Sequence, residues 1–364
     1  MSTPTWHGRE GARIIWAIAA KDVVDAVRNK TLQGIAIGVL LLVLSGRALP
    51  LLAGRSSSHA VIVYDEGQSR LVAALQKRDE LHLSKTRSLQ EMKEAVSGAS
   101  VAVLGLHLPA GLDQALEAGQ PSLLEATAVH WAGQEDVAEI ERAVERALGE
   151  ITGRPVEVSV AEERLYPDPD GGGFTSLAAG LIGMVVVVVG IAFVPHLFAE
   201  EKETQTLQVL LVSPASTGQV VAGKALAGAA YCLAGGGAAM ALNSLYVVHW
   251  EAALLSLLCG TALAVALGLL LGVLFGLPQQ MSAAGALLMG ALVVATFLAD
   301  MVRLPAFLLA VLRWVPTVAM AHALRLSFAE SAPAGWLAAD LGAVLGAALL
   351  VYLLVAWRIR QIDR

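Results

Sequence analysis

Long apolar runs limit what this chain can fold into more than any other feature. A helix that crosses the hydrocarbon core of a bilayer needs about 20 apolar residues. The sequence holds six such runs, at 32–52, 176–198, 219–248, 254–277, 281–301 and 336–357. Only 15% of the 364 residues are charged, against about a quarter in a soluble domain. These runs predict a membrane all-α fold with six transmembrane helices.

The charged residues are concentrated in one segment. Residues 55–175 hold 20 of the 31 acidic residues and 11 of the 25 basic residues, so this segment carries a net charge of −9 while the rest of the chain carries +3. We therefore expect three parts: 1–54 with the first transmembrane helix, a soluble domain at 55–175, and 176–364 with the other five helices.

The soluble segment alternates strand-like and helix-like stretches, which is typical of an α/β domain. Strands are expected at 60–64, 101–106, 122–131 and 156–160, and helices at 68–78, 112–118 and 136–151. The stretch 167–173, PDPDGGG, reads as a flexible joint back to the membrane.

Basic residues beside the spans predict the orientation, because cytoplasmic loops are enriched in Lys and Arg. They flank the first and last spans at Arg13, Lys21, Arg28, Lys30, Arg358, Arg360 and Arg364. Both termini are therefore expected in the cytoplasm of a multi-pass cell-membrane protein, with the α/β domain extracytoplasmic. The mixed apolar and charged stretch 13–31 is expected to form an amphipathic helix along the inner surface.

The stretch 303–333 is apolar, but it is broken by three prolines and is too charged for a clean span. We expect short helices at, or dipping into, the outer interface. Ionisable groups at membrane depth are functional candidates, although interfacial placement is the plainer account for most of them. The candidates are Asp300, Arg303, Arg313, His322, Arg325 and Glu330 near the outer face, and His196 near the inner end of the second span.

The most informative segment is 200–224, EEKETQTLQVLLVSPASTGQVVAGK, on the predicted cytoplasmic side. Its acids suit the start of a helix, and Leu207, Leu210 and Leu211 fall on one helical face. In isolation this pattern indicates only a short surface helix.

The same segment resembles the cytoplasmic signature of ABC type-2 exporter permeases, E-(K/R)-E-x-G-T-L-E-x-L-L-x-(S/T)-P followed by Gly-Lys. It departs from that signature at Gln205 and Gln208. The matching residues are Glu201, Lys202, Glu203, Thr206, Leu207, Leu210, Leu211, Ser213, Pro214, Gly223 and Lys224. The layout of spans, and more weakly 61–75 and 108–119, is similar to the sodium-efflux, NatB-like branch.

The resemblance implies a transport permease that is not itself an enzyme. Its coupling segment, at about 200–216, would dock on a separate cytoplasmic ABC ATPase through Glu200, Glu201, Glu203, Thr206, Leu207, Leu210, Leu211 and Pro214. A second permease subunit, identical or different, would complete a dimer in the lipid bilayer. ATP and Mg²⁺ would bind to the ATPase, so no cofactor or metal is expected in this chain, and no nucleic-acid partner.

The stretch 218–225, GQVVAGKA, is one residue short of a P-loop and has Ala225 where a P-loop has Ser or Thr. We therefore expect no nucleotide site there, and we expect Lys224 to lie at the inner interface near lipid phosphates. Gly268, Gly272 and Gly276 recur every four residues, which predicts close helix packing in the fourth span.

Two other classes stay open at this point. A membrane-anchored sensor would bind a ligand through its outer domain, and an enzyme would need a catalytic constellation that the sequence does not display. The substrate is equally open. The resemblance implies Na⁺, but the spans lack a row of carboxylates, and a lipid or hydrophobic drug fits their apolar lining at least as well.

Overall fold

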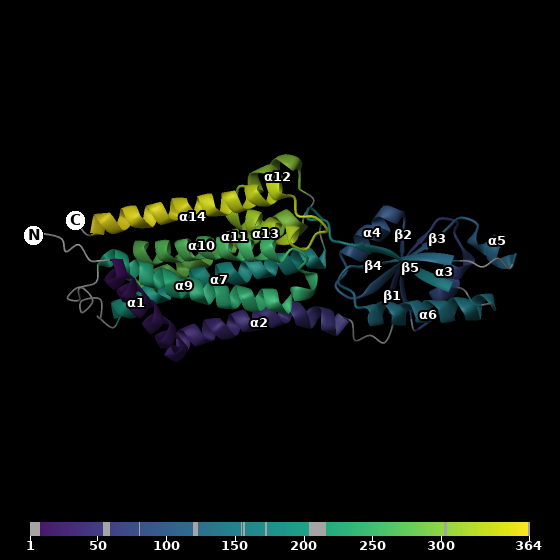
Figure 1. Ribbon diagram of the computed structural model, residues 1–364, viewed down its shortest axis with the longest axis horizontal. Coiled ribbons are helices and arrows are strands. Elements are labelled where there is room, and N and C mark those ends of the chain that lie inside the picture. Colours follow the sequence, from purple (N-terminus) through teal and green to yellow (C-terminus); the bar gives the residue numbers. More distant parts are fainter. Residues whose placement is uncertain are drawn as a thin grey trace, which may run out of the picture.

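The protein consists of a long helical bundle with a sheet-containing unit at one end (Figure 1). The computed structural model describes residues 8–53, 59–79, 81–118, 123–153, 155, 157–171, 173–203, 216–301 and 304–362. The helices of the bundle are α1 (Gly8–Arg28), α2 (Lys30–Ala53), α7 (Phe174–Glu203), α9 (Thr217–Leu242), α10 (Trp250–Leu274), α11 (Pro278–Met301), α12 (Ala306–Leu312), α13 (Pro316–Leu326) and α14 (Ala334–Ile362).

Five helices in the described part of the chain are long and apolar enough to cross a membrane. They cover 174–198, 217–242, 250–274, 278–299 and 334–361. The expected first span, 32–52, corresponds to α2, of which the stretch Leu32–Leu44 is apolar among the described residues. By length and composition the structure thus supports five of the six predicted spans.

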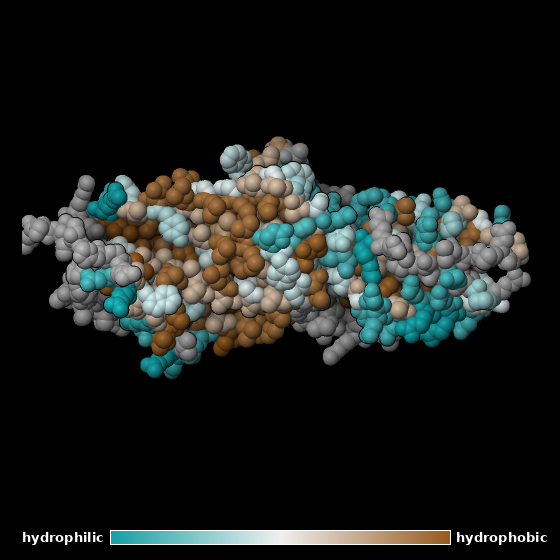
Figure 2. All heavy atoms as spheres, in the orientation of Figure 1, coloured by the Kyte–Doolittle hydropathy of each residue, from teal (hydrophilic) through white to brown (hydrophobic). Residues whose placement is uncertain are grey.

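Helices α7 and α10 form the centre of the bundle, and both are mostly buried, whereas α11 and α14 are mostly exposed at its periphery. Their exposed side chains are largely leucines and valines, such as Leu287, Val294 and Leu349. Figure 2 shows these apolar side chains gathered over the bundle, while polar ones cover the sheet-containing unit. An apolar band of this kind on the outside of a helical bundle is what a lipid environment requires.

The sheet-containing unit, which we call the sheet segment, covers residues 59–165. Five strands lie in the order β2-β1-β3-β4-β5, and all neighbours are parallel except the antiparallel pair β3 and β4. The elements are β1 (His59–Asp65), α3 (Arg70–Leu75), β2 (Leu81–Thr86), α4 (Leu89–Ser97), β3 (Val103–Leu108), α5 (Leu112–Glu117), β4 (Leu123–Val129), α6 (Gln134–Thr152) and β5 (Glu157–Leu165).

Side chains that point alternately to the two faces of the sheet form two hydrophobic cores, one on each face. Val61 and Val63 of β1 face the layer formed by α3 and α6, whereas Ile62 and Tyr64 face α4 on the opposite side. This period of two is what a strand buried on both faces produces. The strand β2 and the helix α4 were missed by sequence analysis. They lie in the stretch 81–97, whose polar residues gave no strong apolar signal.

Aromatic side chains join the sheet segment to the bundle. Tyr246, in the 3-10 turn η1 (Ser244–Tyr246), is 2% exposed. Its ring contacts Trp131 of the sheet segment, with centroids 5.4 Å apart, and also Phe174 and Phe328 of the bundle. The His130 ring stacks on Tyr166, and its Nε2 lies 3.4 Å from the Tyr246 carbonyl oxygen. The two parts therefore meet through packed rings as well as through the joint at 166–173.

The stretch 303–333 forms the two short helices α12 and α13, as predicted. Pro305 is the N-cap residue of α12 and Pro316 is the first residue of α13, positions where a missing backbone N–H costs nothing. Helix α13 is largely buried against α7, α10 and α14. It therefore dips into the bundle and does not lie flat on its surface.

Candidate functional site

The predicted coupling residues begin at the end of α7 and precede α9 in the sequence. Glu200, Glu201 and Glu203 occupy the last turn of α7. The remaining predicted residues, Thr206, Leu207, Leu210, Leu211 and Pro214, fall outside the described part of the chain. Helix α9 then begins with a capping box in which the Ser216 hydroxyl accepts from the Gln219 N–H and the Gln219 side chain accepts from the Ser216 N–H.

The best-defined feature beside this segment is a buried lysine. Lys224 is 0% exposed, and its Nζ lies 3.4 Å from Oδ2 of Asp22 on α1. The same ammonium group donates to the carbonyl oxygen of Leu197 on α7 at 2.6 Å and lies 5.1 Å from the centre of the Phe198 ring. We call these four residues the Lys224 junction. The helices α7 and α9 and the sequence-distant α1 meet at this one charge.

The expectation that Lys224 lies at the lipid interface is wrong. Its ammonium group is turned inward because Asp22, itself 5% exposed, supplies a countercharge from a helix that is distant in sequence. A buried charge is tolerated only when it is paired and hydrogen-bonded. Here the carboxylate, the carbonyl oxygen and the ring face together meet that requirement.

Helix α1 packs closely against α9 at Gly223, the residue before Lys224. A Cβ on Gly223 would lie 2.7 Å from Ile18 Cγ2, so only glycine allows this approach. Two turns beyond Lys224 on α9, the Tyr231 hydroxyl lies 2.9 Å from the Val23 carbonyl oxygen and donates to it. The Gly-Lys pair that follows the coupling motif therefore holds α1 in place: glycine provides the space and lysine the charge.

The exposed side of α1 is apolar in places, with Trp16 68% and Val24 55% exposed. Both α1 and the end of α14 lie at the end of the bundle opposite the sheet segment (Figure 1). The Lys224 junction thus connects the two helices that flank 204–215 with an N-terminal helix that exposes Trp16.

The three predicted packing glycines are not equivalent. A Cβ on Gly268 would lie 2.3 Å from the Gly190 carbonyl oxygen of α7, and one on Gly272 would lie 2.5 Å from the Phe198 ring. Gly276 follows the end of α10 at Leu274 and has open space around it. Only two of the three therefore face α7, and the four-residue pattern ends where the helix ends.

The candidate ionisable residues at the other end of the bundle separate into two groups. Arg313, His322 and Arg325 come together, joined by Asp170 and Asp340, which sequence analysis did not select. Glu330 lies apart, and its carbonyl oxygen contacts the His249 ring. His196 bonds to Ala192 of its own helix. Asp300 lies near the end of α11, and Arg303 lies outside the described residues.

A comparison with known protein families identifies the family of this chain. A profile described as "ABC-2 family transporter protein" matches residues 34–358, most of the chain. The chain belongs to the ABC-2 family of transporter proteins. A comparison with curated proteins gives no match.

As an ABC-2 family protein, the chain is a multi-pass membrane component of an ABC transporter, a class of subunit that normally carries no enzymatic activity and works with a partner ATPase. The match begins inside α2 and ends inside α14, so it includes the sheet segment as well as the bundle. Helix α1, with Asp22, precedes the matched region. Asp22, one of the two residues of the buried ion pair, therefore lies outside the matched region.

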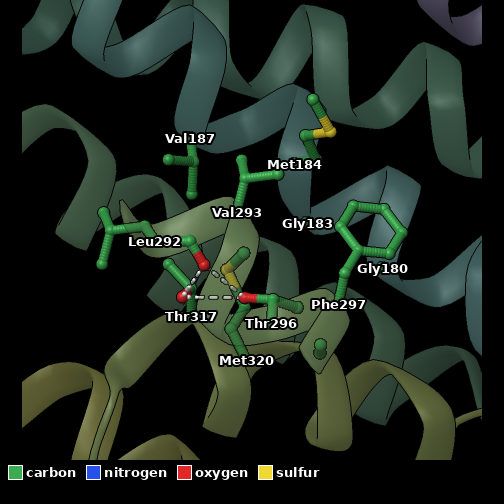
Figure 3. Close-up of a pocket in the computed structure, with 11 residues that line it drawn as sticks. Gly180, Gly183, Met184, Val187, Leu292, Val293, Thr296, Phe297, Thr317 and Met320 are labelled. Carbon is green, nitrogen blue, oxygen red and sulfur yellow. Dashed lines mark hydrogen bonds between the residues drawn. The ribbon is translucent and has the colours of Figure 1, made fainter. Parts of the chain in front are cut away.

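A small cavity lies between α7, α11 and α13 of this ABC-2 family protein (Figure 3). Its volume is about 10 Å³, room for about one water. The Thr296 hydroxyl lies 2.9 Å from both the Thr317 hydroxyl and the Leu292 carbonyl oxygen, so these polar groups satisfy one another. The space is too small for a substrate, and this contact is a packing feature of the bundle.

Proposed function

We propose that the chain is the transmembrane permease subunit of an ATP-driven exporter, belonging to the sodium-efflux, NatB-like branch. The observation that carries the proposal is the match to the coupling motif at 201–214, in a segment whose flanking helices are tied to each other and to α1 by the Lys224 junction. A segment anchored in this way can pass a movement of its partner to the bundle.

The proposed orientation places α1, the coupling segment and both termini in the cytoplasm, and the sheet segment outside. This orientation requires α2 to cross the membrane as well, in addition to the five helices described above. At 24 residues, α2 is about 36 Å long, enough to cross the hydrocarbon core. It runs alongside the bundle from α1 to the sheet segment (Figure 1). The basic residues at both ends of the chain agree with this orientation.

In the proposed mechanism two permease subunits, identical or different, pair with two ATPase subunits that hold ATP and Mg²⁺. ATP binding brings the ATPases together, the coupling segment follows that movement, and the paired bundles open a path outward. The Lys224 junction would keep α7, α9 and α1 moving as one unit. A buried ion pair suits this role because separating its charges in an apolar setting is costly.

The proposed substrate class is an apolar or amphiphilic molecule taken from the inner leaflet or the cytoplasm. The helices of the bundle are lined mainly by Val, Leu, Ala and Gly, and a row of carboxylates along a central helix, which a Na⁺ path would use, is not seen in the described residues. Sodium remains the alternative that the resemblance implies.

Purification from native membranes tests the proposal. A C-terminally tagged chain should recover a P-loop ATPase subunit together with vanadate-sensitive ATP hydrolysis. In proteoliposomes, hydrolysis should rise with members of an apolar substrate panel, and a rise with Na⁺ in their place would favour the sodium alternative. Purification of a chain that carries neither an ATPase subunit nor hydrolysis would contradict the proposal.

A further inference from the structure

A second, larger cavity opens near the sheet-segment end of the bundle, away from the Lys224 junction. Its volume is about 740 Å³, within the range of about 300–1,000 Å³ typical of small-molecule sites. Helices α11, α12, α13 and α14 contribute its walls, and Asp170 and Gly171 of the joint close one side. We call this space the outer cavity. The coupling motif and the family match assign no role to it.

Charged side chains from four parts of the chain form a linked row along the outer cavity. Arg313 Nη2, after α12, lies 3.0 Å from Oδ1 of Asp170 in the joint. The same Oδ1 lies 3.6 Å from Nε2 of His322 on α13, whose Nδ1 lies 2.6 Å from Oδ2 of Asp340 on α14. Arg325 also lines the cavity and donates to the Ser176 hydroxyl at 3.0 Å.

The two ring nitrogens of His322 both face carboxylate oxygens. Nε2 is buried and makes no hydrogen bond within the described residues. Arg313, His322 and Arg325 bring nitrogen-bearing side chains to the wall of the cavity. N–H donors of this kind favour an anion.

The rest of the lining is apolar. Leu309, Val318, Ala339 and Ala343 form it, together with the indole rings of Trp314 and Trp336. The two tryptophans are 86% and 53% exposed, which places them at the mouth of the cavity. Exposed tryptophans of this kind mark the level where lipid head groups begin. A ligand that fills the site therefore needs a charged head and an apolar tail.

We propose that the outer cavity is a binding site for an anionic amphiphile, with its phosphate or carboxylate head at Arg313, His322 and Arg325 and its acyl chain along the apolar helices. The proposal goes beyond the proposed function, because it requires neither an ATPase nor a direction of transport. It rests on the cavity and its charges alone.

Binding of radiolabelled dodecyl phosphate tests it. The chain is placed in nanodiscs of phosphatidylcholine, and empty nanodiscs are subtracted. We expect saturable binding with about one site per chain, competed by excess unlabelled dodecanoate and not by dodecyltrimethylammonium. Competition by inorganic phosphate at equal concentration would show that the head group alone suffices and would contradict the proposal that the ligand is an amphiphile. Binding of the ammonium compound in place of the phosphate would contradict the proposal that the ligand is an anion.

Variants locate the site. Arg313→Gln and His322→Gln should each weaken dodecyl phosphate binding at least tenfold, because a charge-assisted contact is lost (about 1.4 kcal/mol for a tenfold change). Arg142→Gln, on the exposed surface of α6, is the matched control and should bind like the unaltered chain. The Arg313 side chain is 67% exposed, so its variant tests the site even if His322→Gln fails to fold. Equal binding by Arg313→Gln and Arg142→Gln would place the ligand elsewhere.

Discussion

Lys224 of α9 and Asp22 of α1 form an ion pair that is closed to solvent, although 202 residues separate them in the sequence. Helix α1 contacts the bundle mainly through α9, so the pair holds the N-terminal helix in place together with the close approach at Gly223 and the Tyr231 hydrogen bond. It also connects the end of α7 to the start of α9, on either side of the predicted coupling segment.

Replacing the buried lysine should therefore be costly. Lys224→Met leaves Asp22 as a buried charge without its buried partner, and breaking such a pair costs about 3–5 kcal/mol. We expect a clear fall in the thermal unfolding midpoint of the purified chain. Lys21→Met is the matched control: Lys21 also lies 3.6 Å from Asp22, but it is 57% exposed, so its removal should cost less than about 1 kcal/mol. Equal effects of the two variants would show that burial of the pair does not matter.

The same pair should show coupling between its members. Removing both charges, as in Lys224→Met with Asp22→Leu, leaves no unpaired buried charge, so the double variant should be more stable than Lys224→Met alone. Thermal unfolding of the four proteins in one cycle measures this. A double variant less stable than the single one would mean that the lysine and the aspartate act separately.

The crossing of α7 and α10 should not tolerate a methyl group. A Cβ on Gly268 would overlap the Gly190 carbonyl oxygen, and the two helices would have to separate. Gly268→Ala should destabilise the chain by about 1–3 kcal/mol. Gly346→Ala, in the middle of α14 with open space around it, should be neutral or slightly stabilising, since alanine favours a helix. Loss of folded yield with Gly346→Ala and not with Gly268→Ala would contradict this packing.

The contact between the sheet segment and the bundle should weaken in mild acid. Burial lowers the pKa of His130 below its usual 6.5, and hydrogen bonds to the backbone of Tyr246 and Leu165 only partly offset this. The unfolded chain thus takes up a proton at higher pH than the folded chain, and stability falls as pH drops below about 6.5 towards the lower folded pKa. His130→Phe keeps a ring against Tyr166 but cannot titrate.

We therefore expect the unfolding midpoint of the unaltered chain to fall more than that of His130→Phe between about pH 7.5 and 5.5. The measurement is thermal unfolding of both proteins at the two values. An identical fall in both would exclude His130 as the group responsible.

Cysteine labelling tests the proposed orientation with little background, because Cys232 and Cys259 are both buried. Asp168→Cys lies in the exposed joint and Gln361→Cys near the exposed end of α14. In intact spheroplasts a membrane-impermeant maleimide should label Asp168→Cys only, and both variants after lysis. Labelling of Gln361→Cys alone in intact cells would invert the topology.

Periodicity and composition predicted much of the fold. Helices 174–203, 250–274 and 334–362 follow from apolar runs alone, and the strand at 59–65 follows from its β-branched residues. The strand at 81–86 was missed because its sequence, LHLSKT, is short and half polar, and pairing with β1 rather than its own pattern stabilises it.

The sites were less predictable, because their partners are distant in sequence. Lys224 looked like an interfacial lysine since nothing near it indicates a carboxylate; Asp22 lies in a helix chosen for its amphipathic pattern. Asp170 and Asp340 likewise belong to a joint and to an apolar span, and only the fold brings them to His322. For Asp340, its position as a lone charge inside an apolar run was the feature of the sequence that could have identified it as a site residue.

The most direct test of the central claim is a charge placed on the predicted docking face. In a helix over 200–214, Leu210 shares a face with Leu207 and Leu211, while Gln205 lies on the opposite side. Burying a leucine is worth roughly 1.5–3 kcal/mol, and Leu210→Asp replaces that gain with a buried charge. The measurement is the ATPase subunit and the ATP hydrolysis recovered with the tagged permease from native membranes. We expect Leu210→Asp to lose both at normal membrane yield, while Gln205→Asp retains both. Full recovery of the ATPase and its activity with Leu210→Asp would show that this face does not dock on the ATPase.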